Sequence, residues 1–164
     1  MLTQAQLKKI LRYDSKTGEF VWRTRQGRRS DLIGKRAGIV QNKGYLSIGI
    51  SGKRYLGHRL AWLYMHGCFP SGNLDHKNRN RLDNRIINLR VATGAQNAAN
   101  SKRRTSNRGL LKGAFWDKHH QRWTSSIGHN GKPIYLGTFT TAEEAHAAYC
   151  KAAKRLHGEF FHAG

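Results

Sequence analysis

The sequence is poor in acidic residues. Asp and Glu number 9 among its 164 residues, against 30 Lys and Arg, which gives a formal net charge of +21. A chain this basic repels itself unless an anionic partner binds to it. Nucleic acid is therefore the first class of partner to consider, and an anionic membrane surface is the second.

The sequence also lacks long apolar runs. No stretch approaches the roughly 18 apolar residues of a membrane span. Residues 1–14 have neither the apolar core nor the small-residue cleavage site of a signal peptide. The basic residues fall in expected strands and loops as often as in helices, which argues against a membrane-surface helix. We therefore expect no membrane partner and an intracellular, cytoplasmic location.

Cysteine is scarce. Cys68 and Cys150 are the two in the chain, and they form no Cys-x-x-Cys pair. The cysteine spacing therefore argues against a zinc site built from cysteines. A disulfide is not expected in a reducing cytosol.

Apolar spacing and turn residues predict a two-domain α+β chain. In the first part they predict helices over 3–11 and 58–65 and strands over 19–22, 45–50 and 53–56. Residues 100–109 contain no apolar side chain and carry four positive charges. This composition is typical of a linker that orders on a phosphate backbone. We predict a first domain over 1–100, a basic linker over 101–109 and a second domain over 110–164.

The second domain is predicted to be a small three-stranded antiparallel sheet with one packed helix. The expected strands are 114–117, 122–127 and 133–139, and Asn130-Gly131 is typical of a hairpin turn. Thr141 and Glu144 have the spacing of a capping box, which predicts a helix from there to about Leu156.

The candidate catalytic and metal-binding residues lie between Leu74 and Asn97, in a segment whose pattern predicts a strand, a loop, a second strand and a helix. Phosphodiester hydrolysis needs a base that activates water and positive charge at the phosphate and the leaving oxygen. His76 suits the base, because an unperturbed histidine has a pKa of about 6.5. Asp75 and the side-chain carbonyl of Asn97 are oxygen ligands suited to a hard cation. Successive strand residues point to opposite sides, so Asp75 and His76 can serve separate sub-sites.

The order Asp-His, Asn-Leu-Arg and a helix-borne Asn resembles the HNH nucleases with a ββα-metal fold, closest to phage homing and nicking endonucleases. The resemblance covers roughly residues 13–100. It implies a catalytic pair of His76, the general base, and Asn88, which braces the loop and orients that base. It implies Asp75 and Asn97 as ligands of Mg²⁺, for which Mn²⁺ may substitute. The loop arginines expected to contact DNA are Arg79, Arg81, Arg85 and Arg90. For His58 the alternatives are a packing or capping role, contact with the substrate, or support of the site.

Residues 106–164 resemble the APETALA/ethylene-response-factor DNA-binding domain, in the form found fused to phage HNH nucleases. In that family the sheet face away from the helix lies in the DNA major groove. The resemblance implies contacts from basic or aromatic side chains, and the candidates are Lys112, Trp116, Lys118, Arg122, Trp123 and Lys132. Trp123 is equally well interpreted as a core residue.

The sequence thus predicts a phage- or mobile-element-encoded endonuclease of homing or nicking type that acts on double-stranded DNA in the host cell, as a monomer or homodimer. One alternative is a DNA-binding regulator with a non-cleaving HNH domain. Another is an RNA-binding protein. The target sequence, the number of strands cut and the biological role of cleavage do not follow from the sequence.

Overall fold

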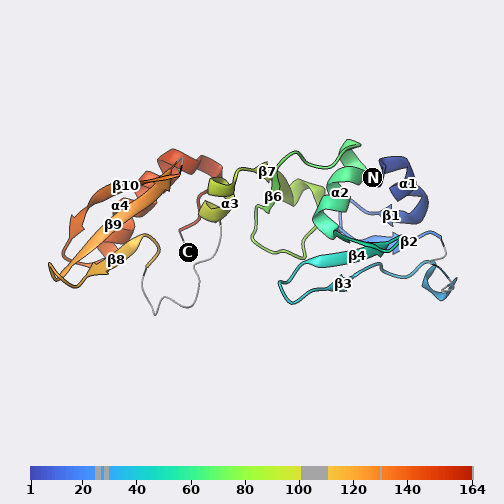
Figure 1. The fold of residues 1–164 in the computed structure, drawn as a ribbon, viewed down its shortest axis with the longest axis horizontal. Helices are drawn as coiled ribbons and strands as arrows, with labels where there is room; N and C mark the ends of the chain where they lie inside the picture. Colours follow the sequence, from blue (N-terminus) through green and yellow to red (C-terminus); the bar gives the residue numbers. More distant parts are fainter. Residues whose placement is uncertain (25–26, 28–29, 101–110, 130, 164) are drawn as a thin grey trace. The chain divides into compact units, whose positions relative to one another are not determined.

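We analysed a computed structural model of the chain, which describes residues 1–24, 27, 30–100, 111–129 and 131–163. Within these residues the fold is α+β, with four α-helices and four small antiparallel sheets (Figure 1). The chain divides into two compact units, a first unit of Met1–Ala92 and a second unit of Thr93–Gly164. Each has its own apolar cluster, so each is described by itself below.

The first unit begins with a capped helix and a hairpin. Helix α1 spans Gln4–Ile10, and its N-terminus is closed by the reciprocal hydrogen bonds of Thr3 and Gln6. Strand β1 (Leu11–Tyr13) pairs antiparallel with β2 (Phe20–Trp22). The expected helix to Leu11 is therefore one residue too long, because Leu11 already belongs to the strand.

A second sheet and a helix follow. The sheet has the order β3-β4-β5, with β3 at Ile39–Val40, β4 at Leu46–Ile50 and β5 at Lys53–Leu56. Strand β5 leads directly into α2 (Gly57–His66), which ends at Gly67 in the left-handed conformation that glycine tolerates without strain. The predicted hairpin and helix are confirmed here, whereas β3 was not predicted.

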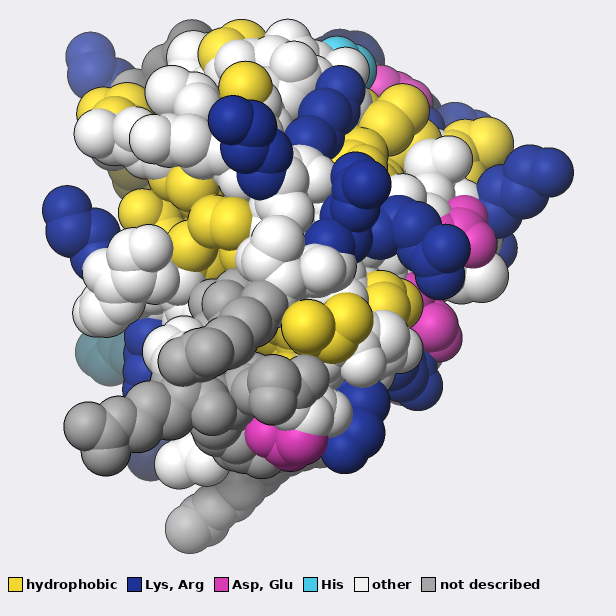
Figure 2. All heavy atoms as spheres, turned by 90° about the vertical axis from the view of Figure 1, so that its right-hand side faces the viewer, with side chains coloured by type: hydrophobic (Ala, Val, Ile, Leu, Met, Phe, Trp, Pro, Cys, Tyr) yellow, Lys and Arg dark blue, Asp and Glu magenta, His cyan; other side chains and the backbone are white. Residues whose placement is uncertain are grey.

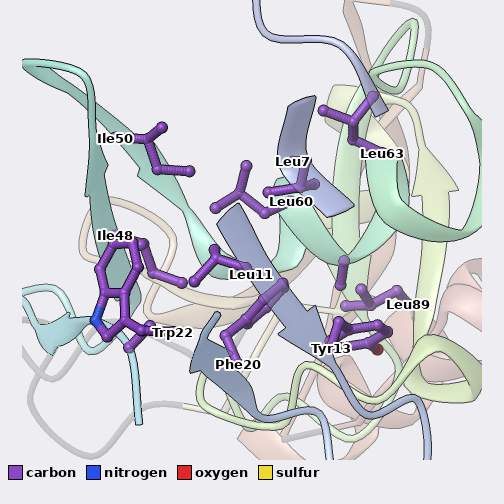
Figure 3. Close-up of a cluster of buried hydrophobic side chains, with 12 residues drawn as sticks. Leu7, Leu11, Tyr13, Phe20, Trp22, Ile48, Ile50, Leu60, Leu63 and Leu89 are labelled. Carbon is purple, nitrogen blue, oxygen red and sulfur yellow. The ribbon is translucent and has the colours of Figure 1, made fainter. Parts of the chain in front are cut away.

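Side chains from these elements form the core of the first unit. Helices α1 and α2 lie side by side. Figure 3 shows their leucines meeting the inward side chains of β1, β2 and β4. The largest fully buried members are Leu7, Leu11, Phe20, Ile48, Ile50, Leu60 and Leu63. Leu89 joins the same cluster, so the segment that carries Asp75 and His76 is anchored to this core.

The last part of the first unit is a two-stranded ribbon. Strand β6 (Asn73–His76) pairs antiparallel with β7 (Leu89–Ala92), and the short 3-10 helix η2 (Ile86–Asn88) leads into β7. Both strands were predicted. The register places Asp75 opposite Arg90 and His76 opposite Leu89.

The second unit contains α3 (Gly94–Asn100) and a sheet of the order β10-β9-β8. The strands span Ala114–Asp117 (β8), Arg122–His129 (β9) and Lys132–Phe139 (β10). One face is covered by α4 (Ala142–His157), which has the predicted capping box of Thr141 and Glu144. The 3-10 helices η1 (Ser30–Leu32) and η3 (Gly158–Phe160) complete the described elements. A three-stranded sheet with one packed helix is thus confirmed.

The units divide after Ala92, whereas the predicted first domain runs to residue 100. Helix α3 contacts α4 and η3, and Ala99 and Asn100 are buried in the second unit. The predicted linker over 101–109 lies outside the described residues, so the predicted boundary stays a prediction.

Two surface properties bear on the partner. No helix among the described residues is both long and apolar enough to pass through a membrane. Figure 2 shows Lys and Arg side chains spread over the visible face, with few acidic side chains among them. Such a surface suits an extended polyanion, which meets positive charge wherever it touches the protein.

Candidate active site

Asp75 and Arg90 form a buried ion pair across the β6–β7 ribbon. Nε of Arg90 donates to Asp75 Oδ2 at 2.9 Å, and Nη2 of Arg90 lies 2.9 Å from the same oxygen in an ion pair. The Asp75 side chain is 6% exposed and the Arg90 side chain is 10% exposed. Removal of either partner would leave an uncompensated charge out of water. The ribbon register therefore fixes the orientation of the Asp75 carboxylate.

His76 is buried at the end of β6 and is 4% exposed. Burial lowers the pKa of its imidazole, while the Asn84 side chain and the Asp75 carboxylate oppose that shift. The ring is therefore held in the neutral form near neutral pH. A neutral imidazole has a nitrogen lone pair, which is what a general base requires.

Two further rings surround His76. The His58 ring meets it edge to face, with a centroid distance of 5.1 Å, and Tyr45 contacts both histidines. His58 is buried at the start of α2, and burial lowers its pKa to about 4. It therefore stays neutral and packs as a ring against His76 without repelling it. The structure assigns His58 to packing beside the site.

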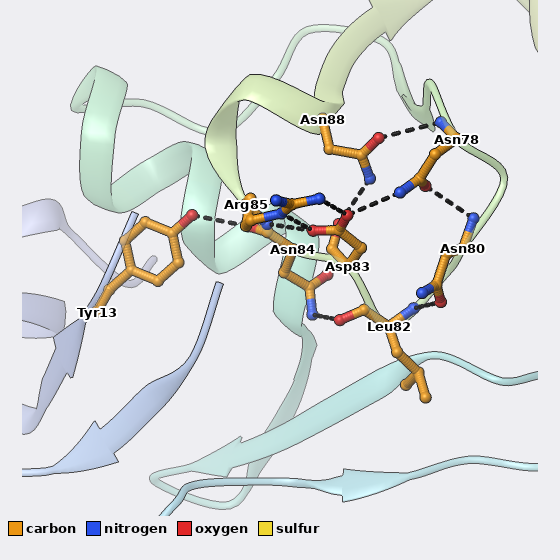
Figure 4. Close-up of polar contacts among 8 residues, drawn as sticks. All are labelled: Tyr13, Asn78, Asn80, Leu82, Asp83, Asn84, Arg85 and Asn88. Carbon is orange, nitrogen blue, oxygen red and sulfur yellow. Dashed lines mark hydrogen bonds and ion pairs between the residues drawn. The ribbon is translucent and has the colours of Figure 1, made fainter. Parts of the chain in front are cut away.

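Asn88 braces the loop that follows His76. Its Oδ1 accepts from the Asn78 backbone N–H at 3.0 Å, and its Nδ2 donates to the Asp83 carbonyl at 2.8 Å (Figure 4). Its own carbonyl accepts from Lys77 N–H at 2.9 Å. These bonds tie the start and the middle of the loop to one buried residue, which fits the predicted bracing role.

The Asp83 carboxylate accepts hydrogen bonds from several side chains of the same loop. It accepts from Asn78 Nδ2 at 2.7 Å and from Arg85 Nε and Nη2 at 2.8 and 2.6 Å (Figure 4). The Arg85 side chain is the main cause that lowers the pKa of Asp83 to about 2. The carboxylate thus stays charged across the physiological range and holds Arg85 in place.

The arginines of this segment that were predicted to contact DNA have different partners within the protein. Arg85 pairs with Asp83 and Arg90 with Asp75. Arg81 donates to the Lys43 carbonyl at 2.8 Å and lies over the Tyr45 ring. Arg79 is exposed in part, at a turn position with φ of 61°. Arg90 is too buried for a free surface contact, so structural support is its first role. DNA contact by the others stays a prediction.

The donor chemistry fits a hard divalent cation. Asp75 offers a carboxylate, a ligand type that hard cations prefer. The described residues contain no group of three or more His, Cys, Asp or Glu side chains that could hold a metal ion. Magnesium is commonly held by one or two carboxylates, with water and substrate phosphate oxygens as the other ligands. A cation on Asp75 would share that carboxylate with Arg90. Asn97 lies on α3 in the second unit, and its pairing with Asp75 stays a prediction.

The second unit places the remaining candidates on two faces of its sheet. In the antiparallel pair of β8 and β9, Trp116 lies opposite Trp123, and the buried Ala114 lies opposite the buried Ser125, two residues along each strand. Since directly paired residues share a face, both tryptophans lie on the side that α4 covers. The expectation that they lie on the opposite face is wrong. Lys112 is tied inside the unit, because its Nζ donates to the carbonyls of Ala99 and His162.

The face of this sheet away from α4, called the open face below, has other side chains. Arg122 lies there, and Lys118 is exposed in the β8–β9 turn, while Lys132 is exposed where β10 begins. Two aromatic residues that sequence reasoning missed, Phe115 and Tyr135, lie on the open face and are 47% and 64% exposed. Because successive strand residues point to opposite faces, the position of Phe115 next to the small Ala114 was the signal that could have found it.

Comparisons with known proteins add independent support. A sequence model of the HNH endonucleases matches residues 55–99, which include Asp75, His76 and Asn88. The chain is 31% identical over 104 residues to protein 3.8 of Escherichia phage T7, a match that covers 63% of this chain and 85% of the phage protein. Residues 55–99 of this chain therefore form an HNH endonuclease family domain. An HNH endonuclease called L560 of Acanthamoeba polyphaga mimivirus, described as uncharacterized, is 28% identical over 130 residues, 79% of this chain and 67% of its own.

One solved structure is also similar, that of the HNH homing endonuclease I-HmuI in a study of DNA binding and cleavage. It is 19% identical with a TM-score of 0.42, and the match covers 87% of this chain and 76% of that one. Members of the HNH family generally depend on a divalent metal ion. The matched segment lies in the middle of the chain, between the N-terminal helix and hairpin and the C-terminal sheet.

Proposed function

We propose that this protein is a metal-dependent endonuclease that hydrolyses phosphodiester bonds in double-stranded DNA, of homing or nicking type. The observation that supports it best is the pair Asp75 and His76 at the end of β6. The paired strands fix one side chain against Arg90, while burial keeps the other neutral. A metal-binding carboxylate and a base thus stand next to each other on one rigid strand.

In this proposal His76 takes the proton from the attacking water. Its ring is neutral and packed against His58, so it holds a lone pair in a fixed direction. Asn88 keeps the following loop closed and so prevents His76 from moving with it. The products would be a 5′-phosphate and a 3′-hydroxyl.

Asp75 and Asn97 are the proposed ligands of a Mg²⁺ ion, for which Mn²⁺ would substitute. Bound there, the ion supplies positive charge to the scissile phosphate and the leaving oxygen. Arg90 holds Asp75 in one orientation before any cation arrives, because it pairs with the buried carboxylate.

The second unit is proposed to act as a DNA-binding module that resembles the APETALA/ethylene-response-factor domain. Its open sheet face offers Arg122, Tyr135 and Phe115, with Lys118 at the adjoining turn. A small sheet of this kind fits the major groove of DNA. The chain would act on DNA inside the host cell, as a monomer or homodimer.

Cleavage of supercoiled plasmid tests the nuclease proposal directly. Incubation in Mg²⁺ is expected to yield nicked or linear plasmid on a gel, whereas EDTA should stop the reaction because Asp75 then has no cation. Mn²⁺ is expected to restore it. If plasmid carrying many sequences stays supercoiled in Mg²⁺ while binding persists, the alternative of a DNA-binding regulator is the correct one. A preference for RNA over duplex in a filter-binding assay would favour the RNA-binding alternative.

Replacement of Arg122 by alanine tests the proposed module. We expect weaker duplex binding across all sequences. The slope of the logarithm of the binding constant against the logarithm of the salt concentration should become shallower by about one, as for the loss of one phosphate contact. Arg155, exposed on α4, provides the matched control, and R155A should bind as wild type does. Fluorescence anisotropy over a series of salt concentrations measures both. Equal losses from both variants would contradict a role for the open face.

A further inference from the structure

Helix α3, which carries Asn97, is short and has little apolar packing. It comprises seven residues, Gly94–Asn100, whereas isolated helices shorter than about 12 residues are marginally stable in water. Its apolar side chains are three alanines, and of these only Ala99 is buried. One buried methyl group adds little to the stability of a helix. The position of α3 therefore depends on polar contacts with the rest of the second unit.

Hydrogen bonds close both ends of α3. At the first end, Thr93 Oγ1 accepts from Gln96 N at 3.2 Å, and Gln96 Oε1 accepts from Thr93 N at 2.8 Å. At the other end, Lys112 Nζ donates to the Ala99 carbonyl at 2.6 Å. The last carbonyls of a helix have no partner within it and carry partial negative charge, so an ammonium group there is stabilising. Asn97 lies between the two closed ends.

Lys112 reaches α3 from a backbone that α4 holds in place. Its carbonyl accepts from His146 Nδ1 at 2.7 Å. Gly113 has φ of 77°, and a Cβ there would lie 2.1 Å from Cγ and Cδ2 of Tyr149, so only glycine fits. Lys112 Nζ also donates to the His162 carbonyl at 3.2 Å. One residue thus joins α3 to α4 and to the segment that follows η3.

We propose that Lys112 is a positioning residue for Asn97: its ammonium group holds α3 within the second unit and so gives the Asn97 side chain one orientation toward a divalent cation. Asn97 is partly exposed, so a cation can reach it. Groups that orient a metal ligand typically contribute 10- to 100-fold in metal affinity. This inference rests on the proposed function, in which Asn97 is a ligand. It replaces the DNA contact first expected of Lys112.

The test compares Lys112→Met with Lys151→Met in the full-length protein. Methionine keeps the apolar stem of the side chain but has no N–H donor, and the backbone contact with His146 is unchanged. Lys151 is exposed on α4, so its replacement removes the same charge from the same unit. Lys112→Arg is the conservative variant, because it keeps a charged donor.

Two measurements are made without DNA. Hydrogen–deuterium exchange of the backbone amides of residues 97–100 reports how firmly α3 is held. Broadening of the Asn97 side-chain amide signals by Mn²⁺, followed by NMR, reports cation binding at that residue. Anisotropy in EDTA measures duplex affinity, and plasmid cleavage over a series of Mg²⁺ concentrations measures activity.

In K112M the α3 amides should exchange about 10- to 100-fold faster, as for the loss of a hydrogen bond to a charged group, while the α4 amides keep wild-type rates. The Mn²⁺ concentration that half-broadens the Asn97 signals should rise about 10-fold or more. K112R should recover part of both effects, and K151M should match wild type. Cleavage by K112M should be slow at low Mg²⁺ and approach the wild-type rate at high Mg²⁺, with duplex affinity equal to that of K151M.

Wild-type exchange at α3 in a folded K112M, or an unchanged Mn²⁺ dependence, overturns the proposal. So does a loss of duplex affinity with no change in exchange, which would return Lys112 to a DNA contact. If K112M does not fold, Lys112→Gln, with a neutral donor, takes its place under the same criteria.

The measurements also separate this inference from the nuclease proposal. If Mn²⁺ broadens Asn97 in wild type and K112M shows both shifts, but wild type cuts no DNA, the nuclease proposal fails and the role of Lys112 stands. If Mn²⁺ leaves the Asn97 signals of wild type sharp, Asn97 is not a ligand and the role of Lys112 fails with it.

Discussion

Replacement of His76 by alanine is expected to slow plasmid cleavage by about 10²- to 10⁴-fold, the usual contribution of a general base. The buried, neutral ring is the group placed to take the proton from water. The Arg and Lys side chains that attract DNA are unchanged in this variant, so duplex affinity measured by anisotropy should stay within error. The rate is read from the conversion of supercoiled to nicked plasmid in Mg²⁺.

His66→Ala is the matched control, since His66 is an exposed histidine of the same unit, at the end of α2. H66A should cut as fast as wild type. A melting curve of H76A separates loss of the base from loss of the fold. If a folded H76A cuts as well as wild type, His76 is not the base and the assignment fails.

Part of this site could be predicted from the sequence alone. Asp75 and His76 are adjacent, chemically apt and followed by a second short apolar segment, so a strand-borne pair was evident. The role of Asn88 in bracing the loop came instead from the resemblance to the HNH nucleases. The prediction of two strands around a polar loop is confirmed by the pairing of β6 and β7.

The contacts between distant residues could not be predicted. The pairing of Asp75 with Arg90 depends on the register of the ribbon, and the polar loop of 77–88 does not reveal that register. Asn84 is buried, but it shows no periodicity that marks it as such. Its enclosure follows from a turn 66 residues earlier, at Gly18, and from a hydroxyl at Tyr13. Such positions are visible only when the chain is folded.

Ambiguous patterns account for the errors. Leu11 fits both the apolar stripe of α1 and the inward face of β1, and the backbone conformation there is extended. In β8 aromatic side chains occupy both faces, so hydrophobicity alone could not tell Phe115 from Trp116. The burial of Ala114 and Ser125 decided which face α4 covers. Small residues in the strands, such as Ala114 and Ser125, indicate the face that a helix covers more reliably than aromatic residues do.

The second large effect is expected on stability. Arg90→Ala should lower the free energy of unfolding of the first unit by about 3–5 kcal/mol, the range for removal of one partner from a buried ion pair. Asp75 would be left charged at 6% exposure with its main neutralising partner gone. Urea unfolding followed by tryptophan fluorescence and circular dichroism measures the change, with EDTA present to exclude metal ions.

Arg36→Ala gives the matched control, because Arg36 pairs with Glu19 at the surface and is 76% exposed. An exposed pair contributes no more than about 1 kcal/mol. Mg²⁺ in place of EDTA should restore part of the stability of R90A and little of that of R36A, since a cation bound to Asp75 neutralises the same carboxylate. If R90A loses no more stability than R36A, the ion pair does not hold Asp75. If Mg²⁺ stabilises both variants equally, Asp75 is not its ligand.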